Sequence, residues 1–235
     1  MNLLLLQPSD FTGADTVQIS DARAQHIRKV LRAELGQQLR CGVLNGQLGS
    51  AEITGLGSTI ELRVNLNTPA PAKLPLTLLL ALPRPKAARR IIRSATELGV
   101  EKIILLNSYR VDKSYWQSPL VDNAHLHAAM LEGLEQCGDT QLPSIERATR
   151  FKPFVEDVLP ALLQHRQGLL AHPYHSQGVP AASNQPRLLA IGPEGGFIPY
   201  EVEKLLAAGM QGFSLGPRIL KVETAVPSII GRLFL

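Results

Sequence analysis

Two glycine-containing segments near the end of the chain combine charged side chains with backbone that can approach a ligand closely. The first, AIGPEGGFIPYEVEKLL (190–206), is an apolar run that ends in glycines, Pro193 and Glu194 before an amphipathic helix begins. The second is LGPRILKVETA (215–225). Glycine lacks a Cβ, so the peptide N–H and C=O groups of such segments can come close to a bound molecule. Taken alone, the first segment is equally compatible with a tight connection between a strand and a helix.

Both segments are expected to follow strands of one mostly parallel sheet. Apolar runs alternate with amphipathic stretches after residue 75, which indicates an α/β domain. The expected strands are 76–82, 102–107, 168–171, 187–191 and 212–215, and the expected helices are 86–98, 120–136, 153–164, 200–208 and a last one from about 224. Ligands of such sheets bind beyond the carboxyl ends of the strands. The two glycine segments leave the same edge, which predicts a ligand site there.

The first seventy residues have the pattern of a small β-rich, barrel-like domain. Strands are expected at 17–19, 38–44, 50–56 and 60–66, and the Asn-Gly pair in NGQLG (45–49) favours a hairpin. One helix is expected at about 22–31, capped by Ser20 or Asp21. The proline-rich stretch TPAPAKLP (68–75) is typical of a linker. We therefore expect two domains, one covering residues 1–70 and the other residues 75–235.

The positive charge of the chain is concentrated in one window. Of 235 residues, 45% are hydrophobic and 19% are charged, as in ordinary globular proteins, and the net charge is +4. Residues 84–113 contain eight Lys or Arg and three acidic residues, which gives this segment alone a net charge of +5. Such a window is typical of a surface that contacts nucleic acid. A solvated helix face explains the same charge equally well.

Several common kinds of site lack support in the sequence. It contains no P-loop motif, no GxGxxG after a strand, no GxSxG and no HExxH. Cys41 and Cys137 match no zinc or redox spacing and are interpreted as reduced thiols of a cytoplasmic protein. His172 and His175 alone do not make a metal site, so no metal is expected. The apolar runs at the two ends are too short for a signal peptide or a membrane span.

Segments along the whole chain resemble one known family. IGPEGGF and LGPRILKVETA are similar to motifs of the SPOUT methyltransferases, and specifically of the RsmE family, which methylates N3 of a uridine in 16S ribosomal RNA. HIRKVLRAELGQQL, RSATELGVEKIILLNSYR and EGLEQCGDTQLPSI resemble further segments of that family, in the same order. The resemblance covers nearly the whole chain, and the two C-terminal motifs are specific.

The resemblance implies a fold, a cofactor and partners. The fold would be a C-terminal SPOUT domain with a deep trefoil knot, a rare exception to unknotted chains, after a PUA-like RNA-binding barrel. The protein would be a homodimer that acts on 16S ribosomal RNA of the small ribosomal subunit. Three loops would hold S-adenosylmethionine, and by position their residues are Ala171, His172, Pro173, Gly192, Glu194, Gly195, Gly196, Leu215, Gly216, Ile219 and Leu220.

Methylation of uracil N3 requires loss of a weakly acidic proton or stabilisation of the anion that develops. The resemblance makes Arg218, Glu223 and Glu194 the catalytic candidates. The candidates for binding the RNA are Arg28, Arg89, Arg110, Arg218 and Lys221. Structural alternatives stay open: Glu194 can cap the following helix or pack its own loop, Glu223 can pair with Arg218, and Arg110 can be an ordinary surface arginine.

Three residues depart from the family pattern. The family usually has RILRTETA where this chain has Lys221 and Val222. Lysine keeps the charge of arginine but lacks its two-pronged guanidinium, which leaves the role of this position open. Pro227 is expected in the first turn of the last helix, where proline is tolerated.

Overall fold

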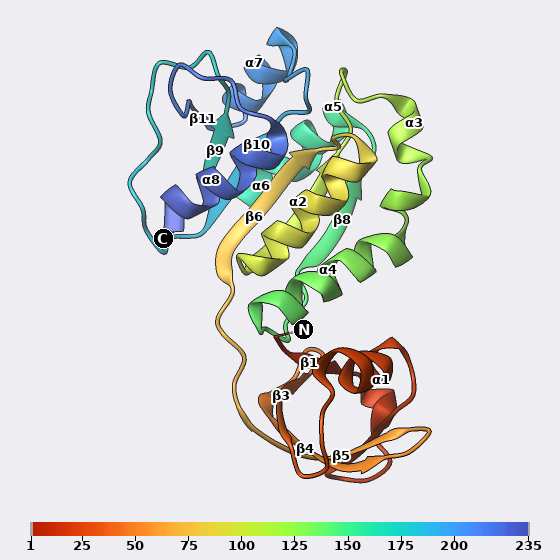
Figure 1. The fold of residues 1–235 in the computed structure, drawn as a ribbon. Helices are drawn as coiled ribbons and strands as arrows, with labels where there is room; N and C mark the ends of the chain where they lie inside the picture. The colour runs from red at the N-terminus through yellow and green to blue at the C-terminus, as the bar shows by residue number, and fades with distance from the viewer. Residues whose placement is uncertain (1, 235) are drawn as a thin grey trace. The chain divides into compact units, whose positions relative to one another are not determined.

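The computed structural model describes residues 2–234, which form two compact units. The first unit consists of residues 2–72 together with 131–142, and the second of residues 73–130 and 143–234. Figure 1 shows the strands of the first unit in red and orange, and the second unit mostly in yellow, green and blue. Each unit has its own sheet.

The first unit is built on a five-stranded sheet with the order β1-β3-β4-β5-β2. The strands are β1 (Leu4–Leu6), β2 (Thr16–Ile19), β3 (Gln38–Val43), β4 (Leu48–Leu56) and β5 (Ile60–Thr68). β1 pairs in parallel with β3, and the other pairs are antiparallel. The expected strands and the hairpin at Asn45 are confirmed. β1 was not predicted, because its run of leucines lacks the alternation that marks a strand.

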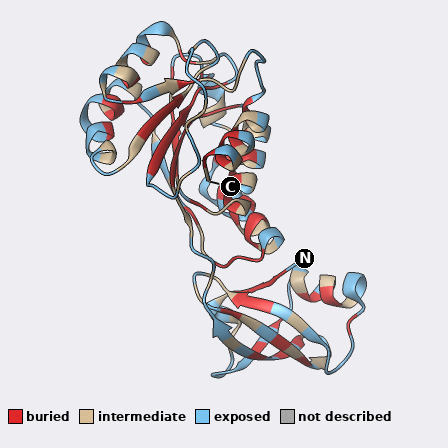
Figure 2. Ribbon diagram, turned by 90° about the vertical axis from the view of Figure 1, so that its left-hand side faces the viewer, coloured by how far each residue is buried: buried red, intermediate tan, exposed pale blue. Residues whose placement is uncertain are grey.

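Short helical turns complete this unit. They are η1 (Pro8–Asp10), α1 (Ala22–His26) and the π-helical turn η2 (Ile27–Leu31). The side chain of Asp21 accepts a hydrogen bond from the backbone N–H of Arg23, which confirms Asp21 as the cap of α1. The core contains Leu4, Leu6, Ile53 and other buried residues. Figure 2 shows buried positions of the chain in red.

The second unit contains a six-stranded sheet in which every neighbouring pair is parallel. Its order is β11-β9-β10-β6-β7-β8. The strands are β6 (Leu74–Ala81), β7 (Val100–Leu106), β8 (Ser144–Ala148), β9 (Gln167–Ala171), β10 (Arg187–Ile191) and β11 (Gln211–Phe213). The predicted parallel sheet is confirmed. β8 was not predicted, because this edge strand is largely exposed and lacks a buried apolar run.

Helices cover both faces of this sheet (Figures 1 and 2). They are α2 (Pro85–Glu97), α3 (Lys113–Trp116), η3 (Pro119–Val121), α4 (Asn123–Cys137), α5 (Phe151–Pro153), η4 (Phe154–Val158), α6 (Leu159–Leu163), α7 (Pro199–Ala207) and α8 (Val222–Phe234). α2 and α8 pack against each other. Gly99 follows α2 with a φ of 78°, which confirms it as the residue that ends this helix.

The last helix begins earlier than its sequence pattern predicts. α8 starts at Val222, because the carbonyl of Lys221 accepts hydrogen bonds from the N–H groups of Thr224 and Ala225. Pro227 therefore lies inside the helix, and its expected place in the first turn is wrong. A proline has no N–H to offer the carbonyl of Glu223 four residues earlier.

The end of α8 is fastened to the loop between β9 and β10. Arg187 is 3% exposed and donates to the carbonyl oxygens of Leu233 and Ala181, both at 2.7 Å. The N–H of Ser183 donates to the same Leu233 oxygen at 3.0 Å. A buried guanidinium needs such partners, and a cation also suits the negative end of a helix dipole. The loop 172–186 is thereby held against the C-terminal helix.

Candidate functional site

A cavity of about 440 Å³ opens at the carboxyl ends of three adjacent strands. β9, β10 and β11 end at Ala171, Ile191 and Phe213, and all three residues line it. The loops that follow these strands supply most of the remaining wall. This is the edge at which α/β sheets bind ligands, as the spacing of the glycine segments predicted.

The cavity collects most of the residues that the sequence indicated. Every residue predicted to hold the cofactor lines it, together with Glu194, Arg110, Arg218 and Lys221 from the catalytic and RNA-binding sets. Glu223, Arg28 and Arg89 are not among the lining residues. The structure thus establishes where these residues lie, and their roles remain predictions.

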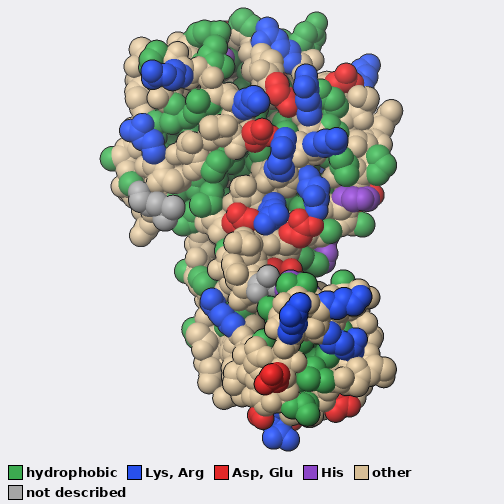
Figure 3. All heavy atoms as spheres, in the orientation of Figure 1, with side chains coloured by type: hydrophobic (Ala, Val, Ile, Leu, Met, Phe, Trp, Pro, Cys, Tyr) green, Lys and Arg blue, Asp and Glu red, His purple; other side chains and the backbone are tan. Residues whose placement is uncertain are grey.

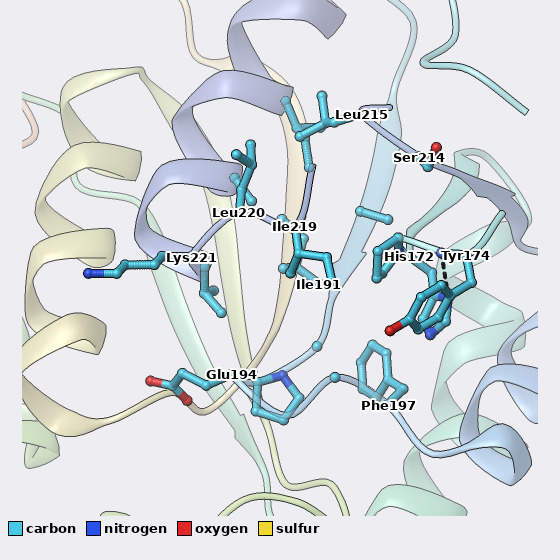
Figure 4. Close-up of a pocket in the computed structure, with 18 of the residues that line it drawn as sticks. His172, Tyr174, Ile191, Glu194, Phe197, Ser214, Leu215, Ile219, Leu220 and Lys221 are labelled. Carbon is cyan, nitrogen blue, oxygen red and sulfur yellow. Dashed lines mark hydrogen bonds between the residues drawn. The ribbon is translucent and has the colours of Figure 1, made fainter. Parts of the chain in front are cut away.

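Large apolar side chains at this cavity are unusually accessible. Tyr174 is 81% exposed and Ile219 is 71% exposed. Figure 4 shows Ile219 and Leu220 on the loop before α8, with His172 and Tyr174 on the opposite side of the cavity. Exposed apolar groups around a hollow are typical of a ligand site. Tyr174 escaped the sequence prediction because its HPYH context suggested only a weak metal motif.

The first loop is organised around His172. Its backbone N–H donates to the carbonyl of Phe213 at 2.9 Å, which joins the loops after β9 and β11. Its ring lies edge-on to Tyr174 and His175, with centroids 5.5 and 5.6 Å away. Burial, reinforced by the nearby His175, lowers the pKa of His172 below its ordinary value of 6.5. The imidazole is therefore neutral at physiological pH.

The second loop is a tight turn through the glycines. The N–H of Gly196 donates to the carbonyl of Pro193 at 2.8 Å, and Gly196 has a φ of 70° that favours glycine. A Cβ on Gly192 would lie 3.0 Å from the nitrogen of Phe197 and 3.2 Å from the backbone of Gly196. The turn therefore needs a glycine at residue 192 for close packing and at residue 196 for its conformation.

Glu194 caps a helix, although not the helix expected. Its Oε1 accepts a hydrogen bond from the backbone N–H of Arg84 at 3.0 Å, at the start of α2. Figure 4 shows the carboxylate directed toward this helix and away from Ile219. The interpretation that Glu194 caps the helix following its own loop is wrong, because Glu201 forms the capping interaction of α7.

Glu223 forms an ion pair that was not predicted. Its Oε2 lies 2.8 Å from Nη2 of Arg90, which links α8 to α2. The alternative pairing of Glu223 with Arg218 is therefore wrong. Arg218 forms no ion pair or hydrogen bond with any residue of the described range 2–234, and it lies exposed at the cavity. A guanidinium without a partner in the protein is available to a substrate.

Arg110 and Arg28, both predicted to bind RNA, hold carbonyl groups within the protein. Nη1 of Arg110 donates to the carbonyl of Gly195. In the first unit, Nη2 of Arg28 donates to the carbonyls of Gly57 and Ser58 at 2.9 and 2.7 Å. Both guanidiniums hold loops, and neither contact was visible in the sequence, because the partners lie 85, 29 and 30 residues away.

The basic window of the sequence becomes a surface over α2. Figure 3 shows Lys and Arg side chains gathered over this helix. Arg84, Lys86, Arg90 and Arg93 are exposed, and the first turn of α2 contains no acidic residue. Positive side chains at a helix N-terminus oppose the helix dipole. Arg90 and Arg93 form ion pairs with Glu223 and Glu97, and Glu194 already places a carboxylate at the N–H of Arg84. The positive charge open to an external anion therefore lies mainly on the side chains of Arg84 and Lys86.

Two other kinds of feature have no candidate in the part of the chain that the structure describes. Residues 2–234 contain no group of three or more His, Cys, Asp or Glu placed to hold a metal ion. Within the same residues, no helix has both the length and the apolar character needed to cross a membrane.

Comparisons with known proteins identify the family. The model of the RNA methyltransferase domain matches residues 70–233, and the model of the RNA methyltransferase PUA domain matches residues 19–65. The chain belongs to this family of RNA methyltransferases. The resemblance inferred from the GPEGG and LGPRILKVETA segments is thereby confirmed, and the α/β domain with a β-rich N-terminal part is confirmed by the two sheets.

Named relatives of this RNA methyltransferase share one description. Ribosomal RNA small subunit methyltransferase E of Treponema pallidum is 31% identical and aligns with 96% of this chain and 87% of its own length. The protein of that name from Synechocystis is 29% identical, over 94% of this chain and 73% of its own length. A structure from Legionella pneumophila, described as a methyltransferase in complex with the cofactor SAM, has a TM-score of 0.76 at 25% identity. The aligned region covers 98% of this chain and 95% of the Legionella chain.

Proposed function

We propose that this RNA methyltransferase transfers a methyl group from S-adenosylmethionine to N3 of a uridine in 16S ribosomal RNA. One observation carries the proposal: all residues predicted for the cofactor, from three separate loops, line the same cavity. The names of the relatives and the cofactor in the Legionella structure support the same reaction. The choice of uridine N3 rests on the resemblance of the two C-terminal motifs to the RsmE family.

The cavity fits S-adenosylmethionine in size and in chemical character. Its volume of about 440 Å³ lies in the range of small-molecule sites, which are mostly apolar with a few polar groups. Leu215, Ile219 and Leu220 offer an apolar wall for the adenine, and the glycine backbone offers polar groups for the rest of the molecule. The neutral ring of His172 adds no positive charge beside a cationic ligand. When bound, the cofactor supplies an electrophilic methyl group.

Arg218 is the residue of this chain best placed for charge stabilisation. Uracil N3 becomes negatively charged as its proton leaves, and a fixed cation near the carbonyl oxygens of the base lowers the energy of that anion. The guanidinium of Arg218 lies at the cavity and has no partner among residues 2–234. Both predicted carboxylates are engaged elsewhere, Glu194 with the backbone of Arg84 and Glu223 with Arg90. We therefore assign Arg218 to stabilisation of the uracil anion.

The basic surface over α2 is proposed to bind the RNA backbone. Figure 4 shows the ammonium group of Lys221 extended toward this helix and away from the apolar residues of the cavity. Together with Arg89 and the exposed Arg84 and Lys86, it provides positive charge beside the site. Phosphate contacts of this kind position an RNA without reading its sequence. Binding through them weakens as the salt concentration rises.

Further features of the proposal follow from the family resemblance. They are domains at 1–70 and 75–235, a PUA-like barrel in the first, a trefoil knot in the second, a homodimer and a cytoplasmic location.

Titration calorimetry and turnover of the Arg218→Ala variant test the proposal together. We expect S-adenosylmethionine to bind both proteins with similar Kd, because Arg218 acts on the base. Turnover of the variant should fall about 100-fold or more, as for loss of a group that stabilises an oxyanion. Arg150→Ala, which removes another exposed arginine of the same unit, is the control and should keep full activity. Undetectable cofactor binding would refute the function, and unaltered turnover would remove Arg218 from the mechanism.

A further inference from the structure

Glu201 is a buried carboxylate behind the cofactor loop that sequence reasoning did not single out. It is 2% exposed and lies in the first turn of α7, five residues after Gly196. A charge this deeply buried is costly unless its oxygens accept hydrogen bonds. Both oxygens do: Oε2 accepts from the N–H of Ile198 at 3.1 Å, and Oε1 from the N–H of Tyr109 at 2.8 Å.

The two bonds join segments that are far apart in the sequence. Ile198 is the residue at which the cofactor loop enters α7, and Tyr109 lies in the loop that follows β7, 92 residues away from Glu201. Capping of α7 alone requires only the bond to Ile198. The bond to Tyr109 has a different consequence, since it fixes the backbone of the residue directly before Arg110.

Arg110 transmits this constraint to the cavity. Its guanidinium donates to the carbonyl of Gly195, and its side-chain carbons pack where a Cβ on Gly195 would lie, with Cδ at 3.0 Å. The N–H of the same peptide unit, which belongs to Gly196, donates to Pro193 at 2.8 Å. This peptide is therefore held at both its oxygen and its nitrogen. Its orientation decides which backbone groups the loop presents to the cavity.

We propose that Glu201 is a positioning residue that holds Arg110, and through it the peptide between Gly195 and Gly196, in the orientation that binds the cofactor. Glu201 does not line the cavity, whereas Arg110 and both glycines do. A loop that is held in its binding conformation loses little freedom when the ligand enters. If only part of the population has that conformation, the apparent affinity falls by the same fraction. The identity of the ligand rests on the function proposed above.

The test measures affinity and turnover separately in matched variants. Glu201→Gln keeps the shape of the side chain, but its amide has one acceptor oxygen in place of two. We expect its Kd for S-adenosylmethionine and for S-adenosylhomocysteine to rise about tenfold, with kcat at saturating cofactor changed less than threefold. Glu203→Gln, an exposed carboxylate on the same helix, is the control and should leave Kd unchanged. Glu201→Asp, which is one methylene too short to serve both donors, replaces Glu201→Gln if that variant does not fold.

A double-mutant cycle with Arg110→Met separates positioning from general loosening of the protein. Methionine keeps apolar bulk beside Gly195 but has no group to donate to its carbonyl. Because both residues act on one peptide, the double variant should bind no more weakly than the weaker of the two single variants. If the wild type binds the cofactor, either of two results would overturn the proposal. One is a rise in Kd of the double variant equal to the product of the two single rises, and the other is a Kd of Glu201→Gln within twofold of the wild-type value. Undetectable binding by the wild type would overturn both this inference and the proposed function.

Discussion

Glu194 offers a sharp test of whether a carboxylate that lines the cavity performs chemistry or holds structure. Its Oε1 accepts from the N–H of Arg84 at the start of α2, whose first turn contains no acidic residue. Glu194→Ala removes the acceptor and the charge, and loss of a cap costs about 0.5–2 kcal/mol of unfolding free energy. Glu194→Gln keeps an acceptor oxygen and loses only the charge, worth about 0.3–1 kcal/mol at a helix N-terminus.

Thermal unfolding and turnover together distinguish a helix-capping role of Glu194 from a role as general base. For a chain of this size, 1 kcal/mol corresponds to about 2–4 °C in Tm, so the alanine variant should melt a few degrees below the glutamine variant. Turnover at saturating cofactor and RNA should stay within about threefold of wild type in Glu194→Gln, whereas loss of a general base costs about 10²–10⁴-fold. Glu203→Gln serves as the charge control. A hundredfold loss of kcat in Glu194→Gln with an unchanged Tm would refute the capping role.

Three further predictions concern packing, burial and protonation. Gly192→Ala should weaken S-adenosylmethionine binding about tenfold, because the new Cβ would lie 3.0 Å from the backbone nitrogen of Phe197. Gly178→Ala is the control and should leave binding unchanged, because no atom lies within 4 Å of its Cβ position; equal calorimetric Kd values for the two variants would contradict this. Arg187→Met should lower the unfolding free energy by about 2–4 kcal/mol, because it removes the charged hydrogen bonds to the carbonyls of Leu233 and Ala181. An unchanged urea midpoint would count against it. Because burial lowers the pKa of His172 below 6.5, its ring gains charge only as the pH falls below that value. Acid should therefore weaken binding of S-adenosylmethionine, whose sulfur is positively charged, more than binding of S-adenosylhomocysteine, whose sulfur is neutral. His172→Gln should abolish this difference.

The sequence indicated the sheet and the position of the site well. Strands buried on both faces appear in the sequence as continuous apolar runs. The strand expected at 187–191, for example, has the same bounds as β10. The glycine turns then marked the strand ends that form the cavity. β8 was missed because an exposed edge strand needs few apolar residues. The inclusion of residues 131–142 in the first unit had no signal either, since the helical pattern of α4 runs through residue 130 without interruption and ends only at Cys137.

The partners of the charged side chains were beyond sequence reasoning. Glu194 contacts a residue 110 positions away, and Glu223 contacts Arg90 rather than the nearby Arg218. Which carboxylate meets which donor depends on how helices pack on the sheet, and local spacing does not encode this. Glu201 is an exception, because a glutamate three residues after Ile198, with Pro199 at the first helical position, is the usual signal of a helix start. This signal was not used in the sequence analysis; it marks a cap but gives no indication of the bond to Tyr109.

Methyl transfer to isolated small ribosomal subunits tests the central claim most directly. Subunits from cells that lack this gene would be incubated with the purified chain and S-adenosylmethionine that carries an isotope-labelled methyl group. Their 16S RNA would then be digested to nucleosides and examined by mass spectrometry. We predict labelled 3-methyluridine as the product, with at least a hundredfold less formed per unit time by Arg218→Ala. Label in any other nucleoside, or no label under conditions in which the chain binds the cofactor, would contradict the account.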